Sequence, residues 1–84
     1  MIPNKPVQFS YDKPNDILYV DLLRPLAAYS EEIDNGIYLR INPNDETVVG
    51  VTIFSYKNRN INDLNSKIDF FVDWENINKQ IIKS

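Results

Sequence analysis

Residues 7–23 read VQFSYDKPNDILYVDLL, and this stretch decides the first half of the fold. Apolar and polar residues alternate over residues 7–11, which is the period of a β-strand with one buried face. Residues 12–16 then break the pattern, because proline presets a turn dihedral and Asp or Asn side chains bond the amides of a turn. Residues 17–23 are apolar on both faces except at Asp21, so we expect a central strand that is covered on both sides. The stretch predicts a β-hairpin.

Further along the chain, the pair Asn35 and Gly36 stands between residues 29–33 and residues 37–41. An Asn-Gly pair is typical of a tight hairpin turn or of a β-bulge, because both need a positive φ that these residues tolerate. We favour the turn. Residues 37–41 alternate as a strand does, whereas residues 29–33 are expected only to lead into the turn.

A second turn is expected over residues 42–46, which combine Asn, Pro, Asp and Glu. The longest strand should follow over residues 47–56, where both faces carry apolar side chains. Gly50 leaves a gap in that strand, which indicates a bulge or a closely approaching neighbour.

The segment 58–84 is rich in asparagine and changes to a helical spacing of apolar residues. One straight helix would not bury the whole stripe, because its last three members point away from the first four. We therefore expect a final helix from Trp74 to about Lys83, with Asp73 as its N-cap. Residues 68–72 are β-branched and aromatic, so they fit a strand or an extended segment as well as a helix. The stripe consists of Ile61, Leu64, Ile68, Phe71, Trp74, Ile77 and Ile81.

These patterns predict one α+β domain over residues 1–84. Residues 7–56 should form a four-stranded, mostly antiparallel β-meander, and residues 58–84 should form a helical segment packed on one face of it. The ten aromatic residues lie on both faces of the expected strands, so one covered face cannot bury them all. Either the C-terminal segment or a second copy of the chain could cover the aromatic side chains at positions 19, 38 and 54.

The composition excludes several kinds of chemistry. The 84 residues include no Cys and no His, so the chain offers no thiolate nucleophile, no imidazole base and no zinc site of the usual kind. Carboxylate chemistry and metals with oxygen ligands remain. The net charge of −3 argues against nucleic acid as a partner, and the basic pair Lys57 and Arg59 is more simply a solvated loop. We expect a cytoplasmic protein, because the sequence has neither a membrane-spanning run nor a signal peptide.

Two groups of carboxylates deserve a functional interpretation beside a structural one. Asp12 and Asp16 flank the first turn, where Asp commonly bonds the turn's own amides. The same pair, joined by Glu32, could instead hold a hard cation or act as an acid and a base. The second group is formed by Glu31, Glu32 and Asp34, which either make an acidic docking edge or belong to a solvated loop.

Three blocks of the sequence resemble, in the same order, the motifs of the YuzE-like family of small prokaryotic proteins of unknown function. The blocks are residues 11–20 (YDKPNDILYV), 31–37 (EEIDNGI) and 48–53 (VVGVTI), within residues 7–56. Two departures stand out: family members commonly carry Gly where this chain has residues 44–46, and the tail after Arg59 matches no family motif. The signature positions that the resemblance gives are Tyr11, Asp12, Asp16, Leu18, Tyr19, Glu32, Gly36 and Gly50.

The resemblance implies a compact antiparallel sheet with a C-terminal helical element. The family has no established activity, but its genes often lie beside small toxin-like partners, which implies an antitoxin or partner-binding role. We therefore expect a non-enzymatic interaction module without a cofactor, which binds another small and basic protein. The alternatives are a carboxylate-based metal-binding protein or enzyme and a self-associating domain such as a homodimer. The candidate partner-binding residues are Glu31, Glu32, Asp34, Tyr38 and Trp74.

Overall fold

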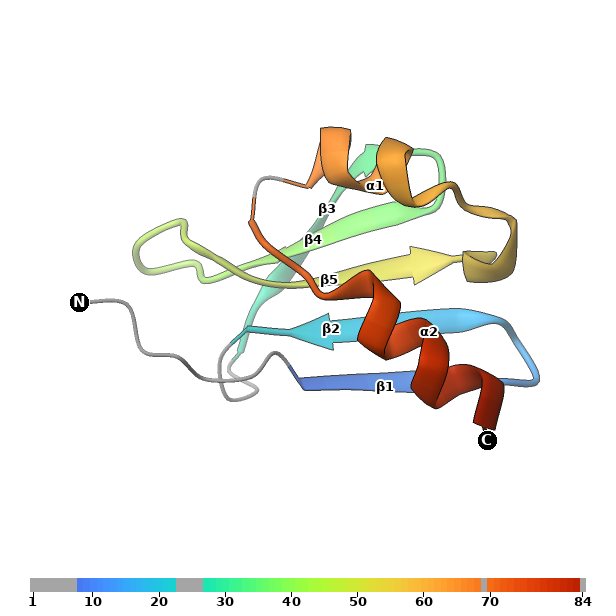
Figure 1. Cartoon of the computed structure of the whole chain (residues 1–84). Helices are drawn as coiled ribbons and strands as arrows, with labels where there is room; N and C mark the ends of the chain where they lie inside the picture. The colour runs from blue at the N-terminus through green and yellow to red at the C-terminus, as the bar shows by residue number, and fades with distance from the viewer. Residues whose placement is uncertain (1–7, 23–26, 69, 84) are drawn as a thin grey trace.

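Figure 1 shows the computed structural model of the chain, which describes residues 8–22, 27–68 and 70–83. A five-stranded sheet is followed by a 3₁₀ helix and two α-helices. Position 7 and position 23, which the expected strands include, lie outside the described residues. The elements are β1 (Gln8–Asp12), β2 (Ile17–Asp21), β3 (Tyr29–Asp34), β4 (Ile37–Ile41), β5 (Val48–Phe54), η1 (Tyr56–Asn58), α1 (Ile61–Lys67) and α2 (Trp74–Lys83).

The strands are ordered β1-β2-β5-β4-β3, and all neighbouring strands are antiparallel. The α+β class and the antiparallel pairing are confirmed, but the expectation of a four-stranded meander is wrong in two respects. A fifth strand, β3, forms one edge of the sheet. In addition, β2 pairs with β5, so that β5 and β4 lie between β2 and the next strand of the sequence.

The strand missing from the prediction, β3, has the sequence YSEEID, and all of its residues except the last are exposed. Such a strand lacks the alternation of buried and exposed residues by which a strand is found in a sequence. It forms because its backbone pairs with β4, from Tyr29 opposite Ile41 to Asp34 opposite Ile37. Its acidic side chains suit an edge strand, where charge opposes pairing with other chains.

The turn between β3 and β4 combines the two features that its Asn-Gly pair predicted as alternatives. Asp34 pairs with Ile37, so Asn35 and Gly36 form a two-residue connection, and Gly36 has a φ of +81°. The register also shifts between Glu32 and Asp34, which is a bulge in β3. A turn and a bulge therefore occur side by side.

The core lies between one face of the sheet and the helices. The sheet contributes alternate residues of its central strands, of which Leu18, Val20, Ile37, Val51 and Ile53 are fully buried. The C-terminal segment covers them, and α2 lies across the β1–β2 side of the sheet in Figure 1. The buried residues of the C-terminal segment are Leu64, Ile68, Val72, Trp74 and Ile77.

The ends of the helices follow the expected capping chemistry. Asp73 caps α2 as predicted, because its carboxylate accepts the N–H of Asn76 at 3.2 Å and its carbonyl accepts that of Ile77. Asn60 caps α1 in the same way, accepting the N–H of Asn62 at 2.8 Å. The described residues of the connector 68–72 are neither helix nor strand.

The longest strand ends earlier than expected, at Phe54 and not at residue 56. Ser55 has a φ of 55°, which turns the chain out of the sheet and into η1. Tyr56 is consequently buried beneath the helices, where its ring stacks on that of Trp74 at a centroid distance of 6.3 Å.

Candidate functional site

The side of the sheet that faces away from the helices carries a row of aromatic and apolar side chains, which we call the open face. Tyr19 is 38% exposed and Phe54 is 41% exposed, while the other members are partly buried. β2 is therefore covered on one face only, contrary to the expectation for this strand. The C-terminal segment covers the opposite face, which includes Phe9 and Tyr11. The open face consists of Ile17, Tyr19, Tyr38, Thr52 and Phe54.

The register of the strands makes the open face continuous across the middle of the sheet. Thr52 of β5 lies between Tyr19 of β2 and Tyr38 of β4. The next row joins Phe54 to Ile17. The rings of Tyr38 and Phe54 meet edge to face, with their centroids 5.6 Å apart. Three adjacent strands therefore present one apolar surface.

Charged residues flank this surface on both sides. Glu32 of β3 pairs with Tyr38, and Asp12 of β1 pairs with Ile17, so each edge of the sheet contributes a carboxylate. Beyond one end, Arg40 Nη1 lies 2.8 Å from Asp21 Oδ1. That ion pair has no net charge, so the two edges contribute the carboxylates of Glu32 and Asp12, while the guanidinium of Arg59 is hydrogen-bonded to the carbonyl of Phe54 near the other end.

Gly50 has no side chain between Asp21 of β2 and Arg40 of β4, so their ion pair can form over the backbone of β5. Its backbone pairs with Asp21 on one side and with Arg40 on the other. A Cβ at this position would lie 2.6 Å from the carbonyl oxygen of Val20 and 3.1 Å from Asp21 Oδ1. The neighbour whose close approach Gly50 indicated is therefore the backbone of β2. The bulge is present as well, because Arg40 pairs with Gly50 and Ile41 with Val48, which leaves Val49 as an extra residue on β5.

The structure divides the acidic group of β3 between the two sides of the sheet. Glu32 pairs with Tyr38 and accepts the N–H of Gly36 at 3.3 Å. Glu31 pairs instead with Leu39, whose side chain packs against the core on the covered side. Of the acidic residues predicted to bind a partner, only Glu32 thus adjoins the open face.

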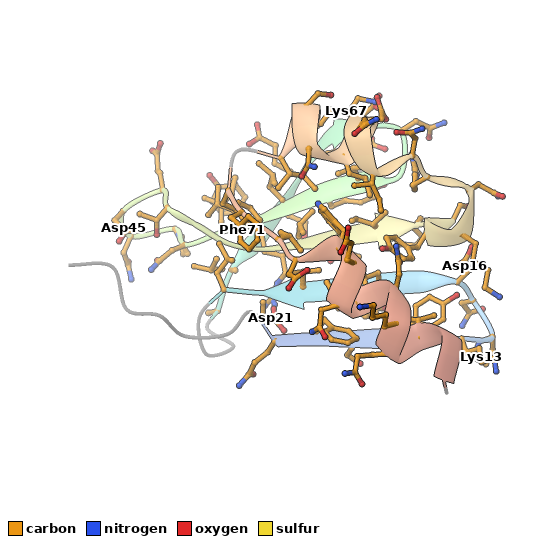
Figure 2. All side chains as sticks on the ribbon, in the orientation of Figure 1. Lys13, Asp16, Asp21, Asp45, Lys67 and Phe71 are labelled. Atoms are coloured by element: carbon orange, nitrogen blue, oxygen red, sulfur yellow. The ribbon has the colours of Figure 1, made fainter. Side chains whose placement is uncertain are left out.

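Asp34 is occupied within the chain. Its carboxylate accepts a hydrogen bond from the ammonium of Lys67 on α1. The same ammonium lies 2.8 Å from the carboxylate of Asp63. Lys67 is labelled at α1 in Figure 2. The hydrogen bond from Lys67 is the main reason that the pKa of Asp34 is lowered. Asp34 therefore links β3 to α1 through an ion pair with Lys67.

Trp74 does not belong to a docking surface, which corrects its assignment as a partner-binding residue. It is only 3% exposed, and its indole N–H donates to Asn65 Oδ1 at 2.8 Å. As the first residue of α2, it enters the core immediately after the cap. An aromatic residue at the start of an amphipathic helix gives no sequence signal that separates these two roles.

Asp16 connects the β1–β2 hairpin, through hydrogen bonds, to the residues that follow β5. Its carboxylate accepts the hydroxyl of Tyr11 at 2.6 Å and the backbone N–H of Lys57 at 3.2 Å, while its carbonyl accepts the N–H of Tyr56. The hydrogen bond to Asp16 is the main reason that the pKa of Tyr11 is raised to about 12. Asp12 bonds within the turn, accepting Asn15 Nδ2 at 2.9 Å.

The structure does not bring Glu32 together with Asp12 and Asp16, the other two carboxylates proposed as a cation site or an acid–base pair. Asp12 and Asp16 belong to the β1–β2 hairpin, whereas Glu32 is on β3 at the other edge of the sheet. Four strand spacings of about 4.8 Å separate those edges. Within residues 8–22, 27–68 and 70–83 there is no group of three or more acidic side chains that could hold a metal ion.

The signature positions mostly shape the fold. Leu18 is in the core, and Tyr19 belongs to the open face. Gly36 faces Arg59, because a Cβ there would lie 2.4 Å from Nη2 of its guanidinium. Arg59 donates to the carbonyl oxygens of Phe54 and Asn35 at 2.8 and 2.9 Å. Sequence reasoning took this arginine for part of a solvated loop, and its distance from the turn along the chain gave no signal of the contact.

No helix among the described residues is long and apolar enough to cross a membrane. A search of the curated proteins and a search of the solved structures each give no match. The family model described as "Protein of unknown function (DUF2283)" matches residues 8–57, which include all five strands and end within η1. This match confirms the resemblance inferred from the three sequence blocks and leaves both α-helices outside it. The chain therefore belongs to the DUF2283 family of proteins of unknown function.

Proposed function

We propose that this protein is a non-enzymatic interaction module whose open face binds a small, basic partner protein. The observation that carries the proposal is that one face of the sheet is covered by helices while the other leaves Tyr19 and Phe54 about two-fifths exposed. Aromatic side chains are enriched at protein interfaces, because they bury a large area at a low cost in conformational entropy.

The chemistry of the partner follows from the margin of the open face. Glu32 and Asp12 stand on opposite sides of it, and the pair of Arg40 and Asp21 beyond one end has no net charge. The chain as a whole carries a net charge of −3. A partner with an apolar patch surrounded by Lys or Arg would complement this surface, and its association would slow as salt screens the charges.

The finer form of this proposal is an antitoxin-like role, in which the partner is the toxin-like product of a neighbouring gene. An acidic module that covers a basic partner suits that arrangement. The described residues of the open face supply no nucleophile activated by a base, so binding is the activity that this surface supports best.

The proposal is tested by reconstituting the complex from purified proteins. The tagged protein is recovered from its host under low-salt and high-salt washes, and any basic protein recovered at equal stoichiometry is then purified separately. Titration calorimetry measures its affinity for the wild type, for the double variant Tyr19→Ala/Phe54→Ala and for Glu32→Lys. We expect one-to-one binding that is weakened at least about tenfold by the double variant and at least about threefold by Glu32→Lys.

Phe71→Ala is the matched control, because Phe71 is 81% exposed but lies in the connector between the two α-helices (Figure 2). The proposal requires this variant to bind as the wild type does. Equal weakening by Phe71→Ala and by the double variant would overturn the assignment of the open face. A stable dimer of the chain alone that Phe54→Ala dissociates would favour the self-associating alternative instead.

A further inference from the structure

A groove of about 670 Å³ opens between η1, α1 and α2, outside the open face. Its wall is apolar, with the buried rings and methyl groups of Tyr56 and Leu64 and the partly buried side chains of Ile61 and Ile81. The volume falls within the range of about 300–1,000 Å³ that is usual for small-molecule sites. The groove is therefore large enough for a small organic ligand.

The amides along its margin present hydrogen-bond donors. Asn78 accepts the hydroxyl of Tyr56 at 2.7 Å through Oδ1, which leaves the NH₂ group of its side chain as a donor. Asn60 uses its Oδ1 to cap α1, accepting from Asn62 and Asp63, so its NH₂ group is also left as a donor. Both asparagines line the groove.

The charged residues that line the groove are basic, although the chain as a whole is acidic and the carboxylate of Asp16 accepts the backbone N–H of Lys57. Lys57 and Arg59 both line the groove, and none of its described lining residues is acidic. The guanidinium of Arg59 is held by two backbone carbonyls. The ammonium of Lys57 takes part in no ion pair within the described part of the chain, so it is the cation best able to meet a ligand.

We propose that this groove binds small carboxylates with an apolar body, such as a medium-chain fatty acid. A carboxylate accepts hydrogen bonds and donates none, which matches a margin of amide donors and one ammonium. Its apolar body would lie against Ile61, Leu64 and Ile81. The site is separate from the protein-binding surface, so the two proposals can fail independently.

The test is an NMR titration of the ¹⁵N-labelled full chain with octanoate, with octylammonium as a probe of opposite charge and acetate as a probe without the chain. We expect octanoate to shift the amides of Lys57, Asn60 and Asn78 saturably, with a dissociation constant of about 1 mM for a ligand of this size. Octylammonium and acetate should each bind at least about fivefold more weakly, because octylammonium lacks the carboxylate and acetate lacks the apolar chain.

Lys57→Glu should weaken octanoate at least about fivefold and strengthen octylammonium, since it reverses the charge at the margin. Lys79→Glu is the matched control, because it changes the net charge by the same amount. Lys79 is an exposed residue of α2 that does not line the groove. It should alter the affinity less than about twofold. Equal affinities for the two charged probes would overturn the proposal. Shifts confined to the open face, or no shifts at the groove up to about 20 mM octanoate, would overturn it as well.

Discussion

The two faces of the sheet are built from the same strands, yet they differ in what covers them. On β5, Ile53 is fully buried beneath the helices, while its neighbour Phe54 is 41% exposed on the open face. On β2, Val20 is buried and Tyr19 is 38% exposed. The strand residues alternate as usual, so the difference comes from the helices and not from the sheet.

The family match sharpens this contrast. It ends at residue 57, so it includes all five strands and leaves both α-helices outside the matched residues. The cover is supplied by residues of this chain's asparagine-rich tail, including Leu64, Trp74 and Ile77. The tail therefore covers the face that becomes the core and leaves the open face exposed.

The largest expected effect comes from comparing two adjacent residues of β5. Ile53→Ala should lower the free energy of unfolding by about 3 kcal/mol, because it opens a cavity in the core. Phe54→Ala should cost about 1 kcal/mol or less, since it removes an exposed ring and one aromatic contact. Urea unfolding followed by circular dichroism measures both. If Ile53→Ala does not fold, Ile53→Val should still cost about 1 kcal/mol. Equal losses for residues 53 and 54 would contradict the division into two faces.

Gly50 lies on the open side of the sheet, but its substitution should still lower the free energy of unfolding substantially. Gly50→Ala places a Cβ 2.6 Å from the carbonyl of Val20, and the resulting shift of β2 against β5 should cost about 2 kcal/mol. Thr52→Ala is the control on the same strand and face, and it should cost about 0.5 kcal/mol or less.

Asp21→Asn separates the two causes that could act at Gly50. It weakens the partly exposed ion pair to Arg40 without adding a Cβ, so its cost should stay below about 1 kcal/mol. A loss as large as that of Gly50→Ala would show that the ion pair, and not the close backbone approach, makes glycine necessary.

The local signals in the sequence predicted more of the covered face than of the open face. Alternation over residues 37–41 and the cap at Asp73 gave elements that the structure confirms, because burial and capping leave periodic or positional marks. β3 left no such mark, since an exposed edge strand is held by its backbone. The order of the strands depends on contacts between β2 and β5 that are distant in sequence, and no local pattern encodes them.

The candidate site was predictable only in part for the same reason. Tyr38 and Glu32 were candidates by residue type alone, and the structure places them opposite each other on neighbouring strands, which the sequence did not predict. Trp74 has the same aromatic character but starts a helix that turns it into the core. Residue type identifies candidates for an interface, while the topology decides which of them share a face.

The tyrosines of the covered side predict a loss of stability in alkali. The hydrogen bond from Tyr11 to Asp16 and the burial of Tyr56 raise the pKa of each to about 12 in the folded protein, against about 10 in the unfolded chain. The unfolded chain therefore loses these protons at a lower pH than the folded protein does. The stability that the two tyrosines contribute is fully present below pH 10 and declines as the pH rises toward 12. Urea midpoints measured over this range should fall steadily.

Asp16→Asn isolates the part of this decline that belongs to Tyr11. Removing the carboxylate should lower the pKa of Tyr11 toward its usual value and flatten the fall, although Lys67, whose pKa is also raised, still contributes in the same direction. Tyrosinate absorbance in the folded state is the direct readout. An unchanged absorbance titration in Asp16→Asn would contradict the role given to that hydrogen bond.

The smallest expected effect lies in the turn between β4 and β5, which belongs to neither face. Glu46 has a φ of 61°, in the left-handed region, which costs an L-residue about 1–2 kcal/mol. Glu46→Gly should raise the free energy of unfolding by about 0.5 kcal/mol, because the greater chain entropy of glycine offsets part of the relieved strain. Glu46→Ala removes the same charge but keeps the Cβ, so it should give no gain. If both variants stabilise the protein equally, the charge of Glu46 and not its backbone conformation sets the cost of this turn.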